Sequence, residues 1–135
     1  MPAVTGEPSR SVCVPSDPVI CVVDDDEEVR DSVGTFFRSA GIEVEKFNSA
    51  EALLEWSDLS SMQCLITDLH MPGMDGLDLQ DALRRRGNQV PVILMTAFPG
   101  PEARARAEAL GVAAFVSKPT DPEALLETVE GLLGL

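Results

Sequence analysis

The segment CLITDLHMPGMDG, residues 64–76, places Asp68 directly after an apolar run and before a loop that contains two glycines and a proline. Continuous apolar runs are typical of parallel strands that are covered on both faces. An aspartate at such a place most often caps a turn and stays in solvent. Whether Asp68 has a further role therefore depends on what the rest of the chain places beside it.

The length of 135 residues is enough for one domain with a single core, and we expect a flexible tail over residues 1–17 followed by a folded domain over 18–135. The three cysteines are too few for a disulfide framework, and their spacing fits no zinc site. The apolar runs are too short to cross a bilayer, and the N-terminus lacks the apolar segment of a signal peptide. We therefore expect a cytoplasmic protein with no membrane contact.

The net charge of −13, from 10 basic and 23 acidic residues, argues against direct nucleic-acid binding by this chain. The one cluster of cations, at residues 84–86, falls at an expected helix end, where the helix dipole accounts for it. The acidity favours a cation or a basic partner surface instead.

Five apolar runs alternate along the chain with five amphipathic stretches. The runs are Val19–Val23, Ile42–Phe47, Cys64–Thr67, Val92–Thr96 and Ala113–Val116. The helices between them are expected at about 29–40, from 48 or 49 to beyond Trp56, at 77–86, at 101–110 and after Asp121. This alternation predicts an α/β fold with a doubly wound parallel sheet. The second run alternates in polarity, which is typical of an edge strand.

Polar side chains follow the expected strands. The first strand ends at Asp24 and Asp25, the third at Asp68, the fourth at Thr96, and the fifth is followed by Lys118. Because ligands of such sheets bind beyond the carboxyl ends of the strands, we expect these groups to share one crevice. Carboxylates that crowd together repel each other unless a cation lies between them.

Mg²⁺ is the cation that fits such a site, because it takes oxygen ligands and is commonly held by one or two carboxylates together with a phosphate. A lysine and a hydroxyl are suited to the remaining phosphoryl oxygens, and an aspartate can itself accept a phosphoryl group as an acyl phosphate. The residues therefore predict phosphoryl transfer onto Asp68, assisted by Lys118 and Thr96.

Four motifs together resemble the receiver domains of two-component response regulators. They are VVDDD (22–26), DLHMPGMDG (68–76), LMTA (94–97) and SKP (117–119), and the likeness extends over about 19–133. The resemblance implies a (βα)₅ flavodoxin-like fold with strand order 2-1-3-4-5. It also implies a signalling phosphoacceptor rather than an enzyme, with a sensor histidine kinase as its phosphodonor.

The same resemblance implies the Mg²⁺ ligands. Asp25 and Asp68 would bind the ion directly, Asp24 would bind it through water, and the backbone carbonyl of His70 would complete the protein ligands. The His70 side chain would line the mouth of the site, although a phosphoryl relay or an imidazole–metal bond is an alternative reading.

A conformational switch is implied as well. Thr96 would shift toward the phosphoryl group, the ring of Phe115 would turn inward, and Pro119 would follow a cis peptide bond. A homodimer through the fourth helix, fifth strand and fifth helix would be one output. Phe115 lacks the hydroxyl of the tyrosine that many receivers carry, and the fourth helix has so little apolar bulk that we expect it to pack weakly.

Three other readings are open at this point. A haloacid-dehalogenase-like phosphatase also uses an aspartyl phosphate, but Glu28 departs from its D-x-D-x-[TV] pattern. A receiver-like module without signalling chemistry is the second, and a redox pair of Cys21 and Cys64 is the third. The segment 29–54 is similar to receivers that precede LuxR-type DNA-binding domains in nitrogen-fixation regulators.

Overall fold

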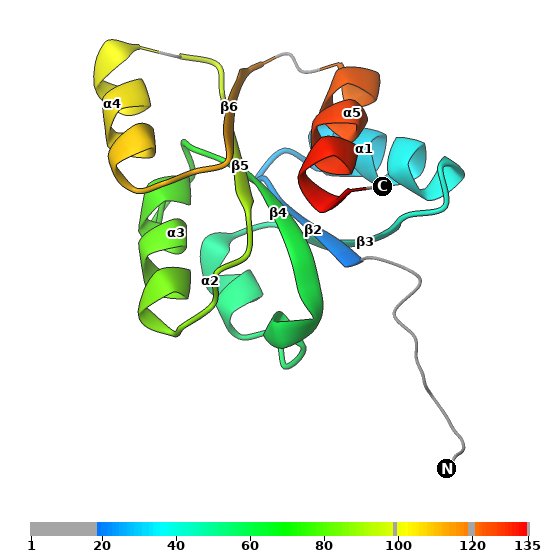
Figure 1. Cartoon of the computed structure of the whole chain (residues 1–135), viewed down its shortest axis with the longest axis horizontal. Helices are drawn as coiled ribbons and strands as arrows, with labels where there is room; N and C mark the ends of the chain where they lie inside the picture. The colour runs from blue at the N-terminus through cyan, green and yellow to red at the C-terminus, as the bar shows by residue number, and fades with distance from the viewer. Residues whose placement is uncertain (1–18, 99, 119–120, 135) are drawn as a thin grey trace.

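A computed structural model of the chain describes residues 19–98, 100–118 and 121–134 (Figure 1). The expected tail at 1–17 and the expected cis bond before Pro119 lie outside the described residues. The strands are β2 (Val19–Val23), β3 (Glu43–Phe47), β4 (Met62–Asp68), β5 (Val92–Thr96) and β6 (Ala114–Ser117). The helices are α1 (Glu27–Ser39), α2 (Ala50–Leu54), the 3₁₀ turn η1 (Leu59–Ser61), α3 (Gly76–Arg85), α4 (Pro101–Ala109) and α5 (Pro122–Leu133).

The strands form one parallel sheet in the order β3-β2-β4-β5-β6, which is 2-1-3-4-5 in chain order. The predicted fold class and strand order are therefore confirmed. The strand β5 is buried along its whole length, whereas β3 lies at the edge and alternates between buried and more exposed residues. This difference reflects their sequences, because the interior strand is continuously apolar and the edge strand is not.

The two faces of the sheet are covered by different helices, as Figure 1 shows, with α1 and α5 on one face and α2, α3 and α4 on the other. The core under α1 and α5 contains Phe37, Ile93 and Leu125, and the opposite core contains Leu65 and Leu83. Both layers leave the carboxyl ends of the strands open at one edge of the sheet.

Local chemistry sets the starts of the helices. Asp26 caps α1 by accepting a hydrogen bond from the amide of Glu28, and Asp75 and Asp78 form a reciprocal capping box at α3. Asp121 caps α5 and Pro122 is its first residue, as expected.

Two details differ from the sequence-based expectation. The second helix ends at Leu54, so Trp56 lies beyond it, where its ring packs against Phe47 with 5.5 Å between the centroids. The buried side chains Cys21 and Cys64 are one residue out of register, since Cys64 pairs with Ile20 and Cys21 with Leu65. Adjacent register positions point to opposite faces, and the two cysteines indeed belong to different cores, so a redox pair is excluded.

Burial raises the pKa of both thiols to about 12, so they remain protonated. Within the described ranges, no helix combines the length and the apolar character that crossing a membrane requires.

Candidate functional site

Three aspartates meet at the carboxyl edge of the sheet. Asp24 follows β2 and is fully buried, Asp68 ends β4 with 5 % of its surface exposed, and Asp25 is exposed. One carboxylate oxygen from each lies within 4.8 Å of the other two. The fold thus brings Asp68 to two aspartates that precede it by 43 and 44 residues in the chain, as the strand-end pattern predicted.

Lys118 enters the same crevice from the end of β6. Its ammonium lies 2.8 Å from Oδ2 of Asp24 and 3.3 Å from Oδ2 of Asp68. Asp24 Oδ1 accepts a hydrogen bond from the amide of Asp26 at 2.9 Å, and Asp24 Oδ2 is paired with the ammonium. Each carboxylate oxygen has more than one acceptor site, so this acidic cluster can also take a cation as a partner.

The charges in this cluster shift two pKa values. Burial, and after it the charge of Asp24, raises the pKa of Asp68, although Lys118 and the backbone amide of His70 act in the opposite direction. Burial by itself would lower the pKa of Lys118, but the hydrogen bond and charge of Asp24, and then Asp68, outweigh it and raise that pKa. The ammonium is therefore retained, while the Asp68 carboxylate is destabilised.

The backbone around Asp68 is tightly packed. The first residue of α3, Gly76, donates its amide to the carbonyl of Leu69 at 3.0 Å. A Cβ at Gly76 would lie 2.6 Å from the backbone oxygen of Asp68 and 2.8 Å from Cδ1 of Leu94. Only glycine allows α3 to begin this close to the strand that carries Asp68.

Thr96, at the end of β5, is buried beside this strand. Its hydroxyl oxygen accepts a hydrogen bond from the amide of Phe98 at 3.0 Å, an arrangement in which the hydroxyl can still act as a donor. The ring of Phe98 is 74 % exposed and meets the exposed ring of His70 edge-on, with 6.0 Å between the centroids. This aromatic pair links the loops that follow β4 and β5.

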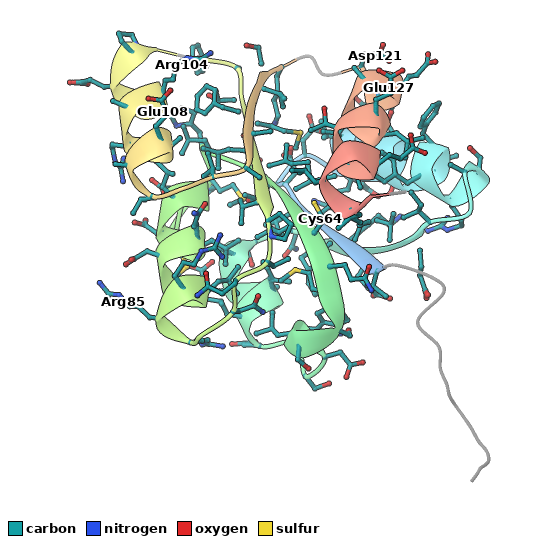
Figure 2. The ribbon with its side chains drawn as sticks, in the orientation of Figure 1. Cys64, Arg85, Arg104, Glu108, Asp121 and Glu127 are labelled. Carbon is teal, nitrogen blue, oxygen red and sulfur yellow. The ribbon has the colours of Figure 1, made fainter. Side chains whose placement is uncertain are left out.

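Phe115 on β6 pairs with Leu94 on β5. Leu94 and Thr96 are two residues apart on β5 and therefore point to the same face of the sheet. Phe115 and Thr96 thus share that face. The Phe115 ring is half-buried, and the guanidinium carbon of Arg104 lies 4.8 Å from its centroid. Figure 2 shows Arg104 on α4, from which it reaches the strand. The helix itself buries one residue, Ala107, which agrees with the expected weak packing.

Two residues beside the site were not singled out from the sequence. Arg30 on α1 donates from Nη1 to the backbone oxygen of Asp24 at 2.6 Å, and Glu51 on α2 accepts the amide of Met74 at 3.1 Å. No signal in the sequence could have found them, because each joins a side chain to a backbone atom of another segment.

The three arginines at 84–86 all contact this chain's own atoms. Arg84 and Arg86 donate to the carbonyls of Asn88 and Leu54 at 3.0 and 3.1 Å, and Arg85 pairs with Asp81 at 3.0 Å. They lie at the C-terminal end of α3, as expected from the sequence.

The family model that describes the response regulator receiver domain matches residues 20–130. This chain belongs to the receiver domain family. The receiver fold also explains why the acidic residues, the threonine and the lysine come from the ends of different strands.

Similar proteins support the same assignment. The receiver is 37 % identical to the transcriptional regulatory protein FixJ of Azorhizobium caulinodans, over 84 % of this chain and 54 % of FixJ. It is 36 % identical to the response regulator protein TodT of Pseudomonas putida, over 87 % of this chain and 52 % of TodT. The chain thus spans about half the length of these curated relatives.

Solved structures share the fold. The response regulator StyR superposes with a TM-score of 0.80 at 37 % identity, covering 88 % of this chain and 60 % of the StyR chain. FixJ-N superposes with a TM-score of 0.77 at 30 % identity, covering 87 % of this chain and 94 % of that chain. The chain is therefore a two-component receiver domain in fold and in family.

Proposed function

We propose that Asp68 is the phosphoacceptor and that a sensor histidine kinase supplies the phosphoryl group as a phosphohistidine. A carboxylate oxygen of Asp68 forms the new bond to phosphorus, the bond from phosphorus to the imidazole nitrogen breaks, and the electron pair stays on that nitrogen. The observation that carries this proposal is the Lys118 ammonium, which lies within 3.3 Å of Asp68 and 2.8 Å of Asp24. A fixed positive charge at this point favours the charge that the acyl phosphate brings to the site.

The donor set fits Mg²⁺. Asp25 and Asp68 would hold the ion directly, Asp24 would hold it through water, and the backbone carbonyl of His70 would complete the protein ligands. The support is the cluster of three carboxylate oxygens within 4.8 Å of one another, in which Lys118 is paired with only two of the three aspartates. When bound, Mg²⁺ supplies positive charge that neutralises the transferring phosphoryl group.

Thr96 and Phe115 would form the switch. The hydroxyl proton of Thr96 is available for a phosphoryl oxygen, because its oxygen is the acceptor in the bond from Phe98. Movement of Thr96 would leave space on the face of the sheet that it shares with Phe115. The surface that responds is that of α4, β6 and α5, and a second copy of this chain is the partner that we propose for it.

The assignment of residues 18–135 to the receiver and of 1–17 to a tail is likewise a proposal. Relatives such as FixJ carry the name transcriptional regulatory protein, so we propose that this receiver takes part in the control of transcription.

The alternative functions are less well supported. A haloacid-dehalogenase-like reaction needs Asp26 as a catalytic group, but its carboxylate caps the amide of Glu28 at 2.9 Å. A module without signalling chemistry would have no need for a lysine between two buried carboxylates, since burying such charges lowers stability.

Intact mass after incubation with acetyl phosphate tests the proposal. We expect a single phosphoryl adduct on the wild type in the presence of Mg²⁺, and none after chelation or in Asp68→Asn. A wild-type protein that binds Mg²⁺ but gains no adduct from either acetyl phosphate or a phosphorylated kinase would overturn it.

A further inference from the structure

We propose that Glu51 is a positioning residue for the Mg²⁺ site, because it holds the loop that presents the His70 carbonyl. The inference rests on the proposed function, since that function makes His70 a metal ligand. Glu51 lies in the first turn of α2, outside the crevice and 23 residues before its partner in the chain.

The contact is a hydrogen bond from the backbone amide of Met74 to Oε2 of Glu51, with a length of 3.1 Å. A Cβ added at Gly73 would lie only 2.9 Å from this same Oε2 atom. The Glu51 carboxylate therefore packs directly on the backbone of the loop. Gly73 has a φ of +78°, a conformation that residues with a side chain rarely adopt. A glycine at this position therefore allows the loop backbone to approach the Glu51 carboxylate closely.

The loop in question, residues 70–75, begins at His70 and is closed at its base. The Leu69 amide donates a hydrogen bond to the carbonyl of Met95 at 2.7 Å, and the Gly76 amide donates one to the carbonyl of Leu69 at 3.0 Å. Glu51 hydrogen-bonds the backbone of this loop from a helix outside it. The base of the loop is thus fixed by the sheet, and its far side is fixed by α2.

A loop fixed at both sides holds the His70 carbonyl in place before the ion arrives. A metal ligand on a loop that must be ordered at the moment of binding costs affinity, and groups that support ligands affect affinity even without touching the ion. Loss of the Glu51 contact should therefore weaken Mg²⁺ binding while leaving the ligands themselves intact.

The test compares Glu51→Ala and Glu51→Gln with Glu55→Ala. Glutamine keeps an acceptor oxygen and loses the charge. Glu55, the C-cap of the same helix, is exposed, and its side chain makes no hydrogen bond or ion pair among the described residues. Its replacement therefore removes the same charge as Glu51→Ala without removing a contact to the loop. Two quantities are measured: the Mg²⁺ dissociation constant by calorimetry, and the exchange rate of the Met74 amide by NMR without Mg²⁺.

We expect Glu51→Ala to weaken Mg²⁺ binding about 3- to 10-fold, less than the roughly 10- to 100-fold typical of groups bonded directly to a ligand. The Met74 amide should exchange faster in this variant, while Glu51→Gln and Glu55→Ala stay within about 2-fold of the wild type in affinity, since exposed charges are largely screened. Equal weakening in Glu51→Ala and Glu51→Gln would overturn the inference, because charge alone would then explain it.

An unchanged Mg²⁺ affinity in Glu51→Ala would also overturn the inference, while leaving the proposed function intact provided that the wild type binds Mg²⁺. A wild type without any Mg²⁺ binding would overturn both. The exchange of the Met74 amide reports on the hydrogen bond between Glu51 and Met74 whether or not the protein binds Mg²⁺, because it is measured without the ion.

Discussion

The ammonium nitrogen of Lys118 lies closer to Asp24, at 2.8 Å, than to Asp68, at 3.3 Å. Before phosphorylation, Lys118 therefore mainly offsets the charge of the fully buried Asp24. A phosphoryl group on Asp68 would compete with Asp24 for the same ammonium. The lysine thus has a stabilising role in the resting protein that is distinct from its proposed role in phosphoryl transfer.

Lys118→Gln should destabilise the metal-free protein by about 2–4 kcal/mol, since two carboxylates lose the cation that offsets them. Mg²⁺ should then raise the melting temperature of the variant more than that of the wild type. Thermal unfolding with and without chelator measures both effects. Lys46→Gln is the control, because the exposed 3.0 Å pair of Lys46 with Asp31 should contribute at most about 1 kcal/mol. Equal losses in the two variants would contradict the prediction.

Asp68→Asn should raise the stability of the metal-free protein at neutral pH. Burial and then Asp24 raise the pKa of Asp68, so the native state keeps this proton to a higher pH than the unfolded chain does. Ionisation of Asp68 therefore costs stability as the pH rises above its ordinary value of 3.8, and the gain in Asp68→Asn should shrink as the pH falls toward that value. Urea unfolding in chelator at several pH values measures this, and a variant less stable than the wild type at pH 7 would refute it.

Phe98→Ala should shorten the lifetime of the phosphorylated protein. Phe98 meets His70 at the site with 6.0 Å between ring centroids, and we hypothesise that the two rings limit the access of water to the acyl phosphate. His70→Ala should act in the same direction. The decay of the phosphoryl adduct, followed by intact mass after removal of the donor, gives the rate. Unchanged decay in both variants would eliminate the hypothesis.

Arg104→Ala should loosen α4. The guanidinium covers the Phe115 ring at 4.8 Å, a contact worth about 0.5–1 kcal/mol at an exposed position. Because α4 buries only Ala107, loss of this contact should speed amide exchange throughout the helix. Arg106→Ala, an exposed arginine two residues along the same helix, serves as the comparison. Equal exchange in the two variants would show that the ring contact does not hold α4.

Gly76→Ala should destabilise the protein by roughly 1–3 kcal/mol, the usual cost of overpacking. The added carbon would lie 2.6 Å from the Asp68 carbonyl, so either α3 or the phosphoacceptor strand must move. Gly131→Ala in α5 is the matched control, because a Cβ there meets nothing within 4 Å and should stabilise the helix by about 0.5–1 kcal/mol. Denaturant unfolding compares them, and a Gly76→Ala protein as stable as the wild type would contradict the close packing.

The sequence determined the order of the elements and which residues reach the crevice. The strands of a parallel sheet all end at the same edge, so Asp24, Asp68 and Lys118 could be expected there from the sequence. The boundaries of β2 and β5 and the start of α5 also followed from local patterns, because side-chain burial and helix capping act over a few residues.

Only the tertiary structure decided the contacts between segments that are distant in the chain. The opposite faces of Cys21 and Cys64 depend on a one-residue offset between β2 and β4, which composition does not encode. The Glu51–Met74 bond and the Arg104–Phe115 contact depend on where helices come to rest on the sheet. Such positions result from packing over the whole domain, and no short stretch of sequence specifies them.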